Sequence, residues 1–424
     1  MFKLRDYQVT LADKCSTILS KMGVVYLAAE VRTGKTLPAL EVAKIKGYKN
    51  VLFLTKKTAI GEWNGPGDER NNGIVAFYRD FEYDKHFKLT VINDESMHKL
   101  TDEYDFVIHD EHHRFGALPK PGRSTKLFKL KYSRLPQMYL SGTISPETYS
   151  QLFHQFWVSI NSPWRSYTNF YKWAVDYVNV KPKHIRGAHT VNDYTDARKE
   201  IILNDIAPYI VTFTQKQAGF ETKVEEEILT VKMKDQTYNM CDRLLSDLVI
   251  EGKEEVILAD TPAKLQQKLH QMYSGTIKFE SGNRMVFDTS KADFIKQKFE
   301  GKKIAIFYKF IAELECLKQV FGDKITNSIP EFNSDPNKWF ASQFLSGREG
   351  TNLSSADYIV FYNIDFSAVT YFQAKDRMTT MDRSVNKVYW LMAKGGIEHK
   401  IYKSVVKKKT YTVSIFKRDF KVKY

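Results

Sequence analysis

Residues 29–36 have the composition of a phosphate-binding loop. They read Ala-Glu-Val-Arg-Thr-Gly-Lys-Thr and match the pattern GxxxxGK[ST], except that Ala29 stands where the first glycine is usual. Lys35 would reach the β- and γ-phosphates, and the Thr36 hydroxyl would bind Mg²⁺, at the start of a helix whose dipole favours anions. An ordinary strand-to-helix turn is the alternative, and the apolar strand before the loop favours the phosphate site. The residues expected at the phosphates are Arg32, Thr33, Gly34, Lys35 and Thr36.

Two adjacent acidic residues, Asp110 and Glu111, follow the apolar run 106–108. If that run is a parallel strand, they lie at its carboxyl end, where open α/β sheets bind ligands. Asp110 can hold Mg²⁺, and Glu111 can orient or deprotonate a water, which are roles that phosphoryl transfer requires. The neighbouring His112 and His113 do not converge easily on one ion, and HExxH is absent, so we expect no zinc.

Short β-branched and aromatic runs alternate with amphipathic stretches of helical length along the chain. The expected strands are 24–27, 51–54, 89–92, 106–108 and 138–140, then 304–307, 358–361 and 388–391. Near-continuous apolar strands separated by helices are typical of parallel sheets covered on both faces. We therefore predict an α/β protein with two domains. They span 1–215, with an aromatic-rich helical extension from about residue 150, and 220–424, which opens with a strand and a helix between 224 and 249.

The chain has 424 residues, 43% hydrophobic and 27% charged, with a formal charge of 64 − 50 = +14. This composition is typical of a globular protein and excludes a single small module. Residues 400–424 carry nine Lys or Arg and one Asp, 9 − 1 = +8, which predicts either a polyanion partner or a solvated face. The three cysteines are far apart, and long apolar runs and a secretory leader are absent. We expect a soluble cytoplasmic protein, in the host's cytoplasm if the source is viral.

With the phosphate loop and the Asp-Glu-x-His element in order, the chain resembles superfamily 2 helicases. Residues 4–8, Leu-Arg-Asp-Tyr-Gln, are similar to the adenine-reading motif, with Gln8 as the amide. Residues 54–58 with Trp63 resemble motif Ia, 141–143 resemble motif III, and 304–308 resemble the strand of motif IV.

Residues 347–353, Gly-Arg-Glu-Gly-Thr-Asn-Leu, and the segment that continues to Arg377 are similar to motifs V and VI of the Swi/Snf-like branch. The resemblance is greatest to the compact helicases of that branch that bacteriophages encode. It implies that Arg377 completes the ATP site and senses the γ-phosphate. Thr380 replaces the family's second arginine, and Arg383 lies three residues further on. Either Arg383 substitutes for that arginine, or hydrolysis depends on Arg377 alone.

The resemblance implies an ATP-dependent DNA helicase or translocase with two RecA-like domains. ATP and Mg²⁺ would bind in the cleft between the domains, and a monomer would bind single- or double-stranded DNA. Gly350, Arg377 and Arg383 would also contact the nucleotide. Residues that couple hydrolysis to motion would be His113, Ser141, Thr143 and Gln373. Residues that contact nucleic acid would be Lys56, Lys57, Thr58, Arg123, Lys309, Thr351 and Asn352.

Two alternatives stay open. An RNA helicase uses the same core, and a comparison of ATPase stimulation by DNA and RNA would separate it from a DNA helicase. A non-hydrolysing, ATP-gated nucleic-acid clamp is the second alternative, and Thr380 motivates it.

Overall fold

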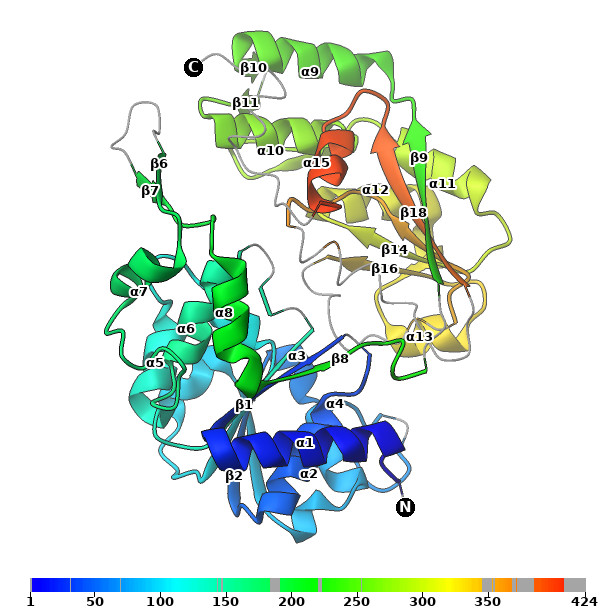
Figure 1. Cartoon of the computed structure of the whole chain (residues 1–424). Coiled ribbons are helices and arrows are strands. Elements are labelled where there is room, and N and C mark those ends of the chain that lie inside the picture. The colour runs from blue at the N-terminus through cyan, green and yellow to red at the C-terminus, as the bar shows by residue number, and fades with distance from the viewer. Residues whose placement is uncertain are drawn as a thin grey trace. The chain divides into compact units, whose positions relative to one another are not determined.

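The structure is a computed structural model in which the chain divides into two compact units, Met1–Phe220 and Glu221–Tyr424 (Figure 1). The residues that it describes are 2–30, 32–68, 70–142, 144–145, 148–183, 191–219, 223–252, 254–344, 353, 355–367, 371 and 385–407. No helix in this described part combines the length and the hydropathy that crossing a bilayer requires.

The first unit is built on a six-stranded parallel sheet with the strand order β3-β2-β4-β5-β1-β8. Its strands are β1 (Val24–Ala29), β2 (Asn50–Thr55), β3 (Lys88–Asn93), β4 (Phe106–His109), β5 (Gln137–Ser141) and β8 (Ile210–Phe213). The five strands predicted for this part of the chain are confirmed. Strand β8 was not predicted, because it is a short edge strand in which Thr212 is exposed.

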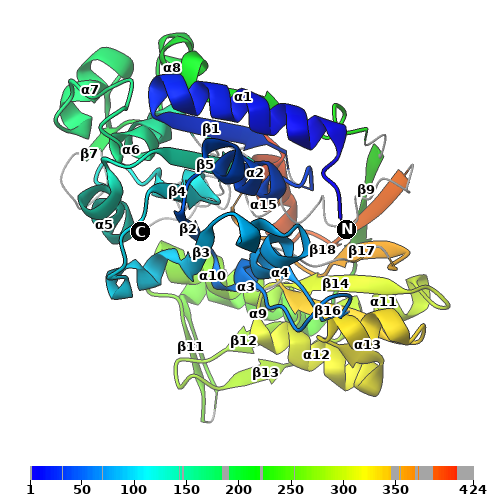
Figure 2. The same ribbon diagram turned by 90° about the horizontal axis from the view of Figure 1, so that it is seen from below.

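Helices cover both faces of this sheet (Figure 2). On one face, α1 (Asp6–Met22), α2 (Thr36–Lys46) and α4 (Gly73–Asp80) pack in a core that contains Val25. On the other, α5 (Arg123–Tyr132), α6 (Leu152–Trp157), α7 (Phe170–Tyr177) and α8 (Lys199–Ile206) pack in a core that contains Val24. Successive residues of a strand point to opposite faces, so a strand that is covered twice must be apolar throughout.

The remaining elements of the first unit are short. They are α3 (Lys57–Ile60), the 3₁₀ helices η1 (Tyr83–Lys85), η2 (Asp94–Lys99), η3 (His112–Phe115), η4 (Tyr149–Gln151) and η5 (Ala207–Tyr209), and the antiparallel pair β6 (Lys181–Lys183) and β7 (Val191–Asp193).

The second unit contains another six-stranded parallel sheet, in the order β15-β16-β14-β17-β18-β9. Its strands are β9 (Lys223–Val231), β14 (Ile304–Tyr308), β15 (Ile325–Thr326), β16 (Trp339–Gln343), β17 (Tyr358–Phe361) and β18 (Val385–Ala393). Its helices are α9 (Asp235–Asp247), α10 (Pro262–Met272), α11 (Ser290–Lys298), α12 (Ile311–Phe321), η6 (Gly322–Lys324), α13 (Ile329–Ser334) and α15 (Glu398–Val405). Its described residues also form two hairpins: β10 (Val249–Glu251) with β11 (Val256–Leu258), and β12 (Thr276–Lys278) with β13 (Arg284–Val286). The predicted strands and the opening strand and helix are confirmed, whereas β15 and β16 were not predicted.

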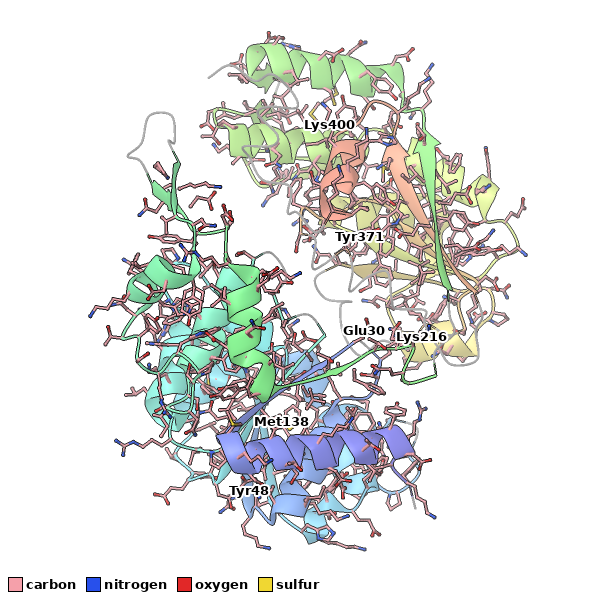
Figure 3. All side chains as sticks on the ribbon, in the orientation of Figure 1. Glu30, Tyr48, Met138, Lys216, Tyr371 and Lys400 are labelled. Carbon is pink, nitrogen blue, oxygen red and sulfur yellow. The ribbon has the colours of Figure 1, made fainter. Side chains whose placement is uncertain are left out.

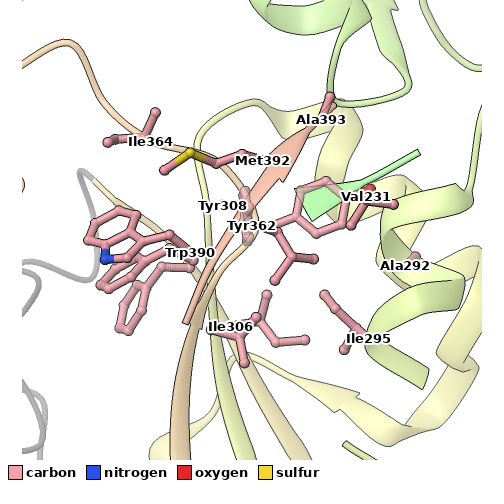
Figure 4. Packing of buried hydrophobic residues seen from close by; sticks show 14 of the residues in the cluster. Val231, Ala292, Ile295, Ile306, Tyr308, Tyr362, Ile364, Trp390, Met392 and Ala393 are labelled. Atoms are coloured by element: carbon pink, nitrogen blue, oxygen red, sulfur yellow. The ribbon is translucent and has the colours of Figure 1, made fainter. Parts of the chain in front are cut away.

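The core of the second unit combines stacked aromatic rings with one buried ion pair. Trp390 of β18 stacks on Phe361 of β17 with ring centroids 4.0 Å apart, and Figure 4 shows Trp390 among the strands of the sheet. Lys291 of α11 and Glu398 of α15 are fully buried and lie 2.8 Å apart. The prediction of two α/β units with parallel, helix-covered sheets is confirmed, while an ATP site between them stays a prediction.

Candidate nucleotide-binding site

The loop between β1 and α2 has a conformation that demands glycine at one position. Arg32 and Gly34 have positive φ angles of 62° and 70°, and Lys35 immediately precedes the first helical residue, Thr36. A side chain at position 34 would be strained by the positive φ, and its Cβ atom would lie 2.7 Å from Nε2 of Gln8 and displace that amide. The loop leads directly into the start of α2, and the N-terminus of a helix is an arrangement that suits an anion.

The base of the loop is bonded to the edge strand β8. The N–H of Glu30 donates to the carbonyl oxygen of Phe213 at 2.9 Å, and the N–H of Gln215 donates to Glu30 Oε2 at 2.7 Å. The Thr33 hydroxyl donates to the carbonyl oxygen of Glu30 at 2.7 Å and closes the turn. Figure 3 labels Glu30 close to Lys216, in the segment that follows β8.

Residues before and within α1 hold the loop from the other side. Gln8 Nε2 donates to the carbonyl oxygen of Gly34 at 3.4 Å, and Gln8 Oε1 accepts from the N–H of Arg5 at 3.0 Å. The Tyr7 hydroxyl donates to the carbonyl oxygen of Thr33 at 3.2 Å. The structure thus brings Gln8, predicted to read the base, against the predicted phosphate loop.

A cavity of about 390 Å³ opens beside these residues. Ligand pockets commonly start at about 300 Å³, so the cavity has the size for a nucleoside. The contributions of Phe77, Asp80 and Phe81 to its wall were not predicted, because a helical pattern shows which residues pack and not which cavity they line. The lining residues that were predicted from the sequence are Gln8, Arg32 and Gly34.

Asp110 is a buried carboxylate with one unused oxygen. Its Oδ2 accepts from the Thr55 hydroxyl at 3.2 Å, whereas its Oδ1 is buried without a hydrogen-bond partner among the described residues. Burial raises the pKa of Asp110, and the nearby charge of Lys35 opposes that shift. A buried carboxylate oxygen without a hydrogen-bond partner is a candidate ligand for a cation. The oxygens of Asp110 and Thr36 are of the ligand type that Mg²⁺ prefers. The residues therefore fit Mg²⁺.

No cluster of three or more His, Cys, Asp or Glu side chains that could hold a metal occurs among the described residues. Mg²⁺ does not need such a cluster, because it is usually bound by one or two carboxylates together with waters and the oxygens of a substrate phosphate.

Glu111, His113 and Ser141 meet at the carboxyl ends of β4 and β5. His113 Nδ1 lies 2.8 Å from Ser141 Oγ and 3.3 Å from Glu111 Oε2. The hydrogen bond of Nδ1 is to the Ser141 hydroxyl, which can donate or accept, and the Glu111 carboxylate lies close to the same nitrogen. Burial, together with the charges of Lys56 and Arg114, lowers the pKa of His113 to about 3, so the ring is neutral at pH 7. This neutral ring lies between Glu111, the predicted catalytic base, and Ser141, the predicted coupling residue.

His112, for which the sequence suggested no role, is a fully buried packing residue. Its ring stacks on Tyr139 with centroids 3.6 Å apart, and its Nε2 lies 2.7 Å from the carbonyl oxygen of Gln155. Because a carbonyl only accepts, Nε2 carries the hydrogen and Nδ1 is left as an acceptor. Burial and the neighbouring His109 lower the pKa of His112 well below its ordinary value.

His109 completes a buried chain behind the acidic pair. Its Nδ1 lies 2.5 Å from His112 Nδ1, and its Nε2 lies 3.1 Å from Asp94 Oδ1. Asp94 also pairs with Arg114 at 2.9 Å, and His109 and Arg114 help to hold the pKa of Asp94 below its ordinary value in spite of burial.

The predicted nucleic-acid residues are placed differently from one another. Lys57 and Thr58 are exposed in the first turn of α3, after β2, and Lys56 precedes that turn. Arg123 is exposed at the start of α5. Lys309 is paired with Asp365 at 3.2 Å, and its ammonium group lies 3.7 Å from the ring centroid of Phe366. Its ammonium group is therefore already engaged within the second unit.

Several predicted residues lie outside the described residues. They are Thr143 of motif III, Gly350, Thr351 and Asn352 of motif V, and Gln373, Arg377, Thr380 and Arg383 of motif VI. Most of the basic carboxyl-terminal segment, from Lys408 onward, also lies outside them.

Comparison with known proteins gave matches only among solved structures. No family model and no curated protein matches the chain. The SWI2/SNF2 ATPase core of Sulfolobus solfataricus in complex with double-stranded DNA is 15% identical, with a TM-score of 0.40 over 98% of this chain and 92% of that one. The helicase domain of Hef from Pyrococcus furiosus is 15% identical, with a TM-score of 0.44 over 95% of this chain and 98% of that one.

Proposed function

We propose that the protein is an ATP-dependent DNA helicase or translocase whose ATPase activity is stimulated by nucleic acid. The observation that supports this most is that the candidate residues follow the carboxyl ends of three neighbouring strands. Strands β4, β5 and β1 are neighbours in the first sheet, and their carboxyl ends carry the Asp110–Glu111 pair, Ser141 and the phosphate loop. Binding, activation of water and coupling can therefore occur within one small region.

The residues divide the work of hydrolysis among them. Lys35 and the N–H groups of the loop hold the phosphates, while Thr36 and Asp110 hold Mg²⁺, which when bound neutralises phosphate charge. Glu111 accepts the proton of the attacking water or orients it. The neutral His113 keeps Glu111 in contact with Ser141, so a change at the γ-phosphate reaches motif III.

The second unit would supply the remaining groups of the reaction. In this proposal Arg377 stabilises charge on the transferred phosphoryl group, an effect worth about 10³ to 10⁵ in rate. Gly350 and Arg383 would also contact the nucleotide, and Gln373 would take part in coupling. These assignments depend on the motif resemblance, as do a DNA partner, a bacteriophage-like origin, a cytoplasmic location and a monomeric state.

ATP turnover by the purified chain, with and without single-stranded DNA or RNA, tests the proposal. Lys35→Ala should abolish turnover, whereas Glu111→Gln should stop turnover and leave ATP binding largely intact. Lys49→Ala is the matched control, because Lys49 is exposed and lies outside the site. A wild-type protein that binds ATP and DNA without turnover would instead support the ATP-gated clamp, and stronger stimulation by RNA would support an RNA helicase.

A further inference from the structure

A long stretch of the first unit contains no acidic residue. Between Glu111 and Glu147 there is no Asp or Glu, whereas the overall frequency of 50 in 424 would give about four. The same stretch has seven basic residues: Arg114, Lys120, Arg123, Lys126, Lys129, Lys131 and Arg134. Natural protein surfaces usually mix both signs of charge, so a segment of this length with one sign of charge requires a reason.

Helix α5 turns part of this charge outward in a single stripe. Thr125, Phe128 and Tyr132 are buried, and the two aromatic rings belong to the core between the helices and the sheet. At 100° per residue, Arg123 and Lys126 lie about 60° apart around the helix axis. Lys120 lies three residues before the helix begins, and Arg134 lies in the turn two residues after it ends. All four are exposed. At 1.5 Å per residue, the ten residues of α5 are about 15 Å long.

The cations of the stripe are free of partners within the described structure, unlike their neighbours. Lys131 donates to the carbonyl oxygens of Met97 and Leu100, and the ammonium group of Lys129 lies 3.5 Å from the ring centroid of Trp157. In contrast, no ion pair or side-chain hydrogen bond involves Lys120, Arg123, Lys126 or Arg134 in the part of the chain that the structure describes. Their charge is therefore not neutralised by the protein.

The stripe runs away from the carboxyl ends of the strands, where the candidate site lies. Helix α5 connects the parallel strands β4 and β5, so it runs back from their carboxyl ends to their amino ends. Arg123 lies toward the carboxyl ends of the strands, as Lys57 and Thr58 do. Arg134 lies close to their amino ends, shortly before β5 begins. A strand of nucleic acid that follows the carboxyl edge would meet Arg123 and would not meet Arg134.

We propose that this α5 stripe (Lys120, Lys126 and Arg134, continuing from Arg123) binds the phosphate backbone of a second nucleic-acid segment, a duplex arm next to the translocated strand. The proposal rests on the proposed function. Helix α5 alone spans about four base pairs of rise at 3.4 Å each, and the uncompensated charge of the stripe is complementary to phosphate. An anionic membrane is a poorer fit, because Leu130 is the one large apolar side chain that the described part of α5 exposes. The preferred substrate would therefore be branched.

Binding of two DNAs to the full chain tests the proposal: a fork with a duplex arm and a single-stranded tail, and the tail alone. The variant Lys120→Ala/Lys126→Ala/Arg134→Ala should lose at least about 10-fold in affinity for the fork at 0.15 M salt. Its log–log salt slope on the fork should become shallower by about 0.9 for each phosphate that the protein no longer neutralises. Affinity for the tail should not change. The control variant Lys14→Ala/Lys21→Ala/Lys49→Ala removes the same charge from exposed positions outside the stripe and should match the wild type on both DNAs.

Each other outcome has a definite meaning. Equal losses on fork and tail would place the stripe in the main strand track, and no loss on the fork would make it a solvated surface; either result overturns the proposal. Loss of binding to phosphatidylserine vesicles with fork binding intact would assign the stripe to a membrane and overturn it as well. If the wild type neither binds DNA nor shows DNA-stimulated ATPase activity, the proposed function fails as well. If the wild type is active and the triple variant binds the fork equally well, only the proposal for the stripe is rejected.

Chemical labelling of a cysteine in the stripe tests its contact with the fork without a measurement of binding affinity. The three native cysteines are buried, so Leu130→Cys introduces a thiol in the middle of the stripe at a position that is 82% exposed. Fork DNA should protect this thiol from a maleimide several-fold, and the tail alone should not. Equal labelling rates with and without the fork would contradict the proposal.

Discussion

Replacing Asp110 by Asn should stabilise the protein in the absence of nucleotide and remove its function. The carboxylate is buried, one of its oxygens has no hydrogen-bond partner among the described residues, and burial raises its pKa. A neutral amide is less costly to bury and can still accept the hydrogen bond from Thr55. The same substitution weakens the Mg²⁺ site, so the gain in stability and the loss of turnover have a single cause.

The size of the gain follows from the charge, because the substituted amide would still leave one buried polar atom without a partner. An unsatisfied buried polar group costs about 1–3 kcal/mol and a charged one costs more; the charge of Lys35 offsets part of that difference, which leaves an expected gain of about 1–2 kcal/mol. For a unit of this size, 1 kcal/mol moves the melting temperature by about 2–4 °C, so Tm should rise by about 2–8 °C. The folded wild type keeps the Asp110 proton at pH values where the unfolded chain releases it. Its stability therefore falls as the pH rises from the ordinary aspartate pKa through the raised value, and the advantage of the variant should grow over that interval.

Thermal unfolding at several pH values measures this effect, with ATPase assays beside it. Asp13→Asn, the same substitution at an exposed position, is the control and should leave Tm unchanged. A magnesium complex of a non-hydrolysable ATP analogue at 100 times its Kd should stabilise the wild type by about 2.7 kcal/mol and the Asp110→Asn variant by less. A fall in Tm of the nucleotide-free variant would refute the reasoning, because it would show that attraction to Lys35 outweighs the cost of burial.

Three further substitutions address other parts of the site. His112→Ala should lower the free energy of unfolding in urea by about 3–5 kcal/mol, because it leaves a cavity and two unpaired buried polar groups; a loss below about 1 kcal/mol would contradict its role in packing. Gly34→Ala should weaken binding of a fluorescent ATP analogue at least about 10-fold, whereas Gly47→Ala, with a similar φ of 69° and no atom within 4 Å of the added Cβ, should leave binding unchanged. Arg377→Ala should reduce DNA-stimulated turnover at least about 10²-fold and Arg383→Ala should change it little; the opposite order would assign the finger to Arg383.

The central strands were predicted from their burial. Residues 51–54 and 106–108 are apolar without interruption because both faces of the sheet are covered, and that pattern is visible in a single sequence. The edge strand β3 is only half-buried, and its run of mostly β-branched residues indicated it instead. Strand β8 contains an exposed Thr212, and β16 ends in polar residues, so neither has a continuous apolar pattern.

The candidate site shows the same division. Lys35, Asp110 and Glu111 could be proposed from the sequence because the chemistry expected of them depends on a local order of residues after a strand. The role of His112 depends on contacts with Tyr139 and Gln155, which are distant in sequence. No local sequence pattern predicts those contacts. The unused oxygen of Asp110 is likewise a property of packing, and only coordinates can reveal it.

The attachment of the phosphate loop to β8 has a mechanical consequence. Strand β8 is followed by residues 214–219, the last described residues before the second unit begins at Glu221. Tension in this connection acts along β8, whose residues Ile210–Phe213 are paired in parallel register with Tyr26–Ala29 of β1. Such a load shears the paired residues, so their hydrogen bonds resist it together instead of breaking one at a time. Since Glu30 is bonded to both Phe213 and Gln215, a pull from the second unit would be felt first at the base of the phosphate loop.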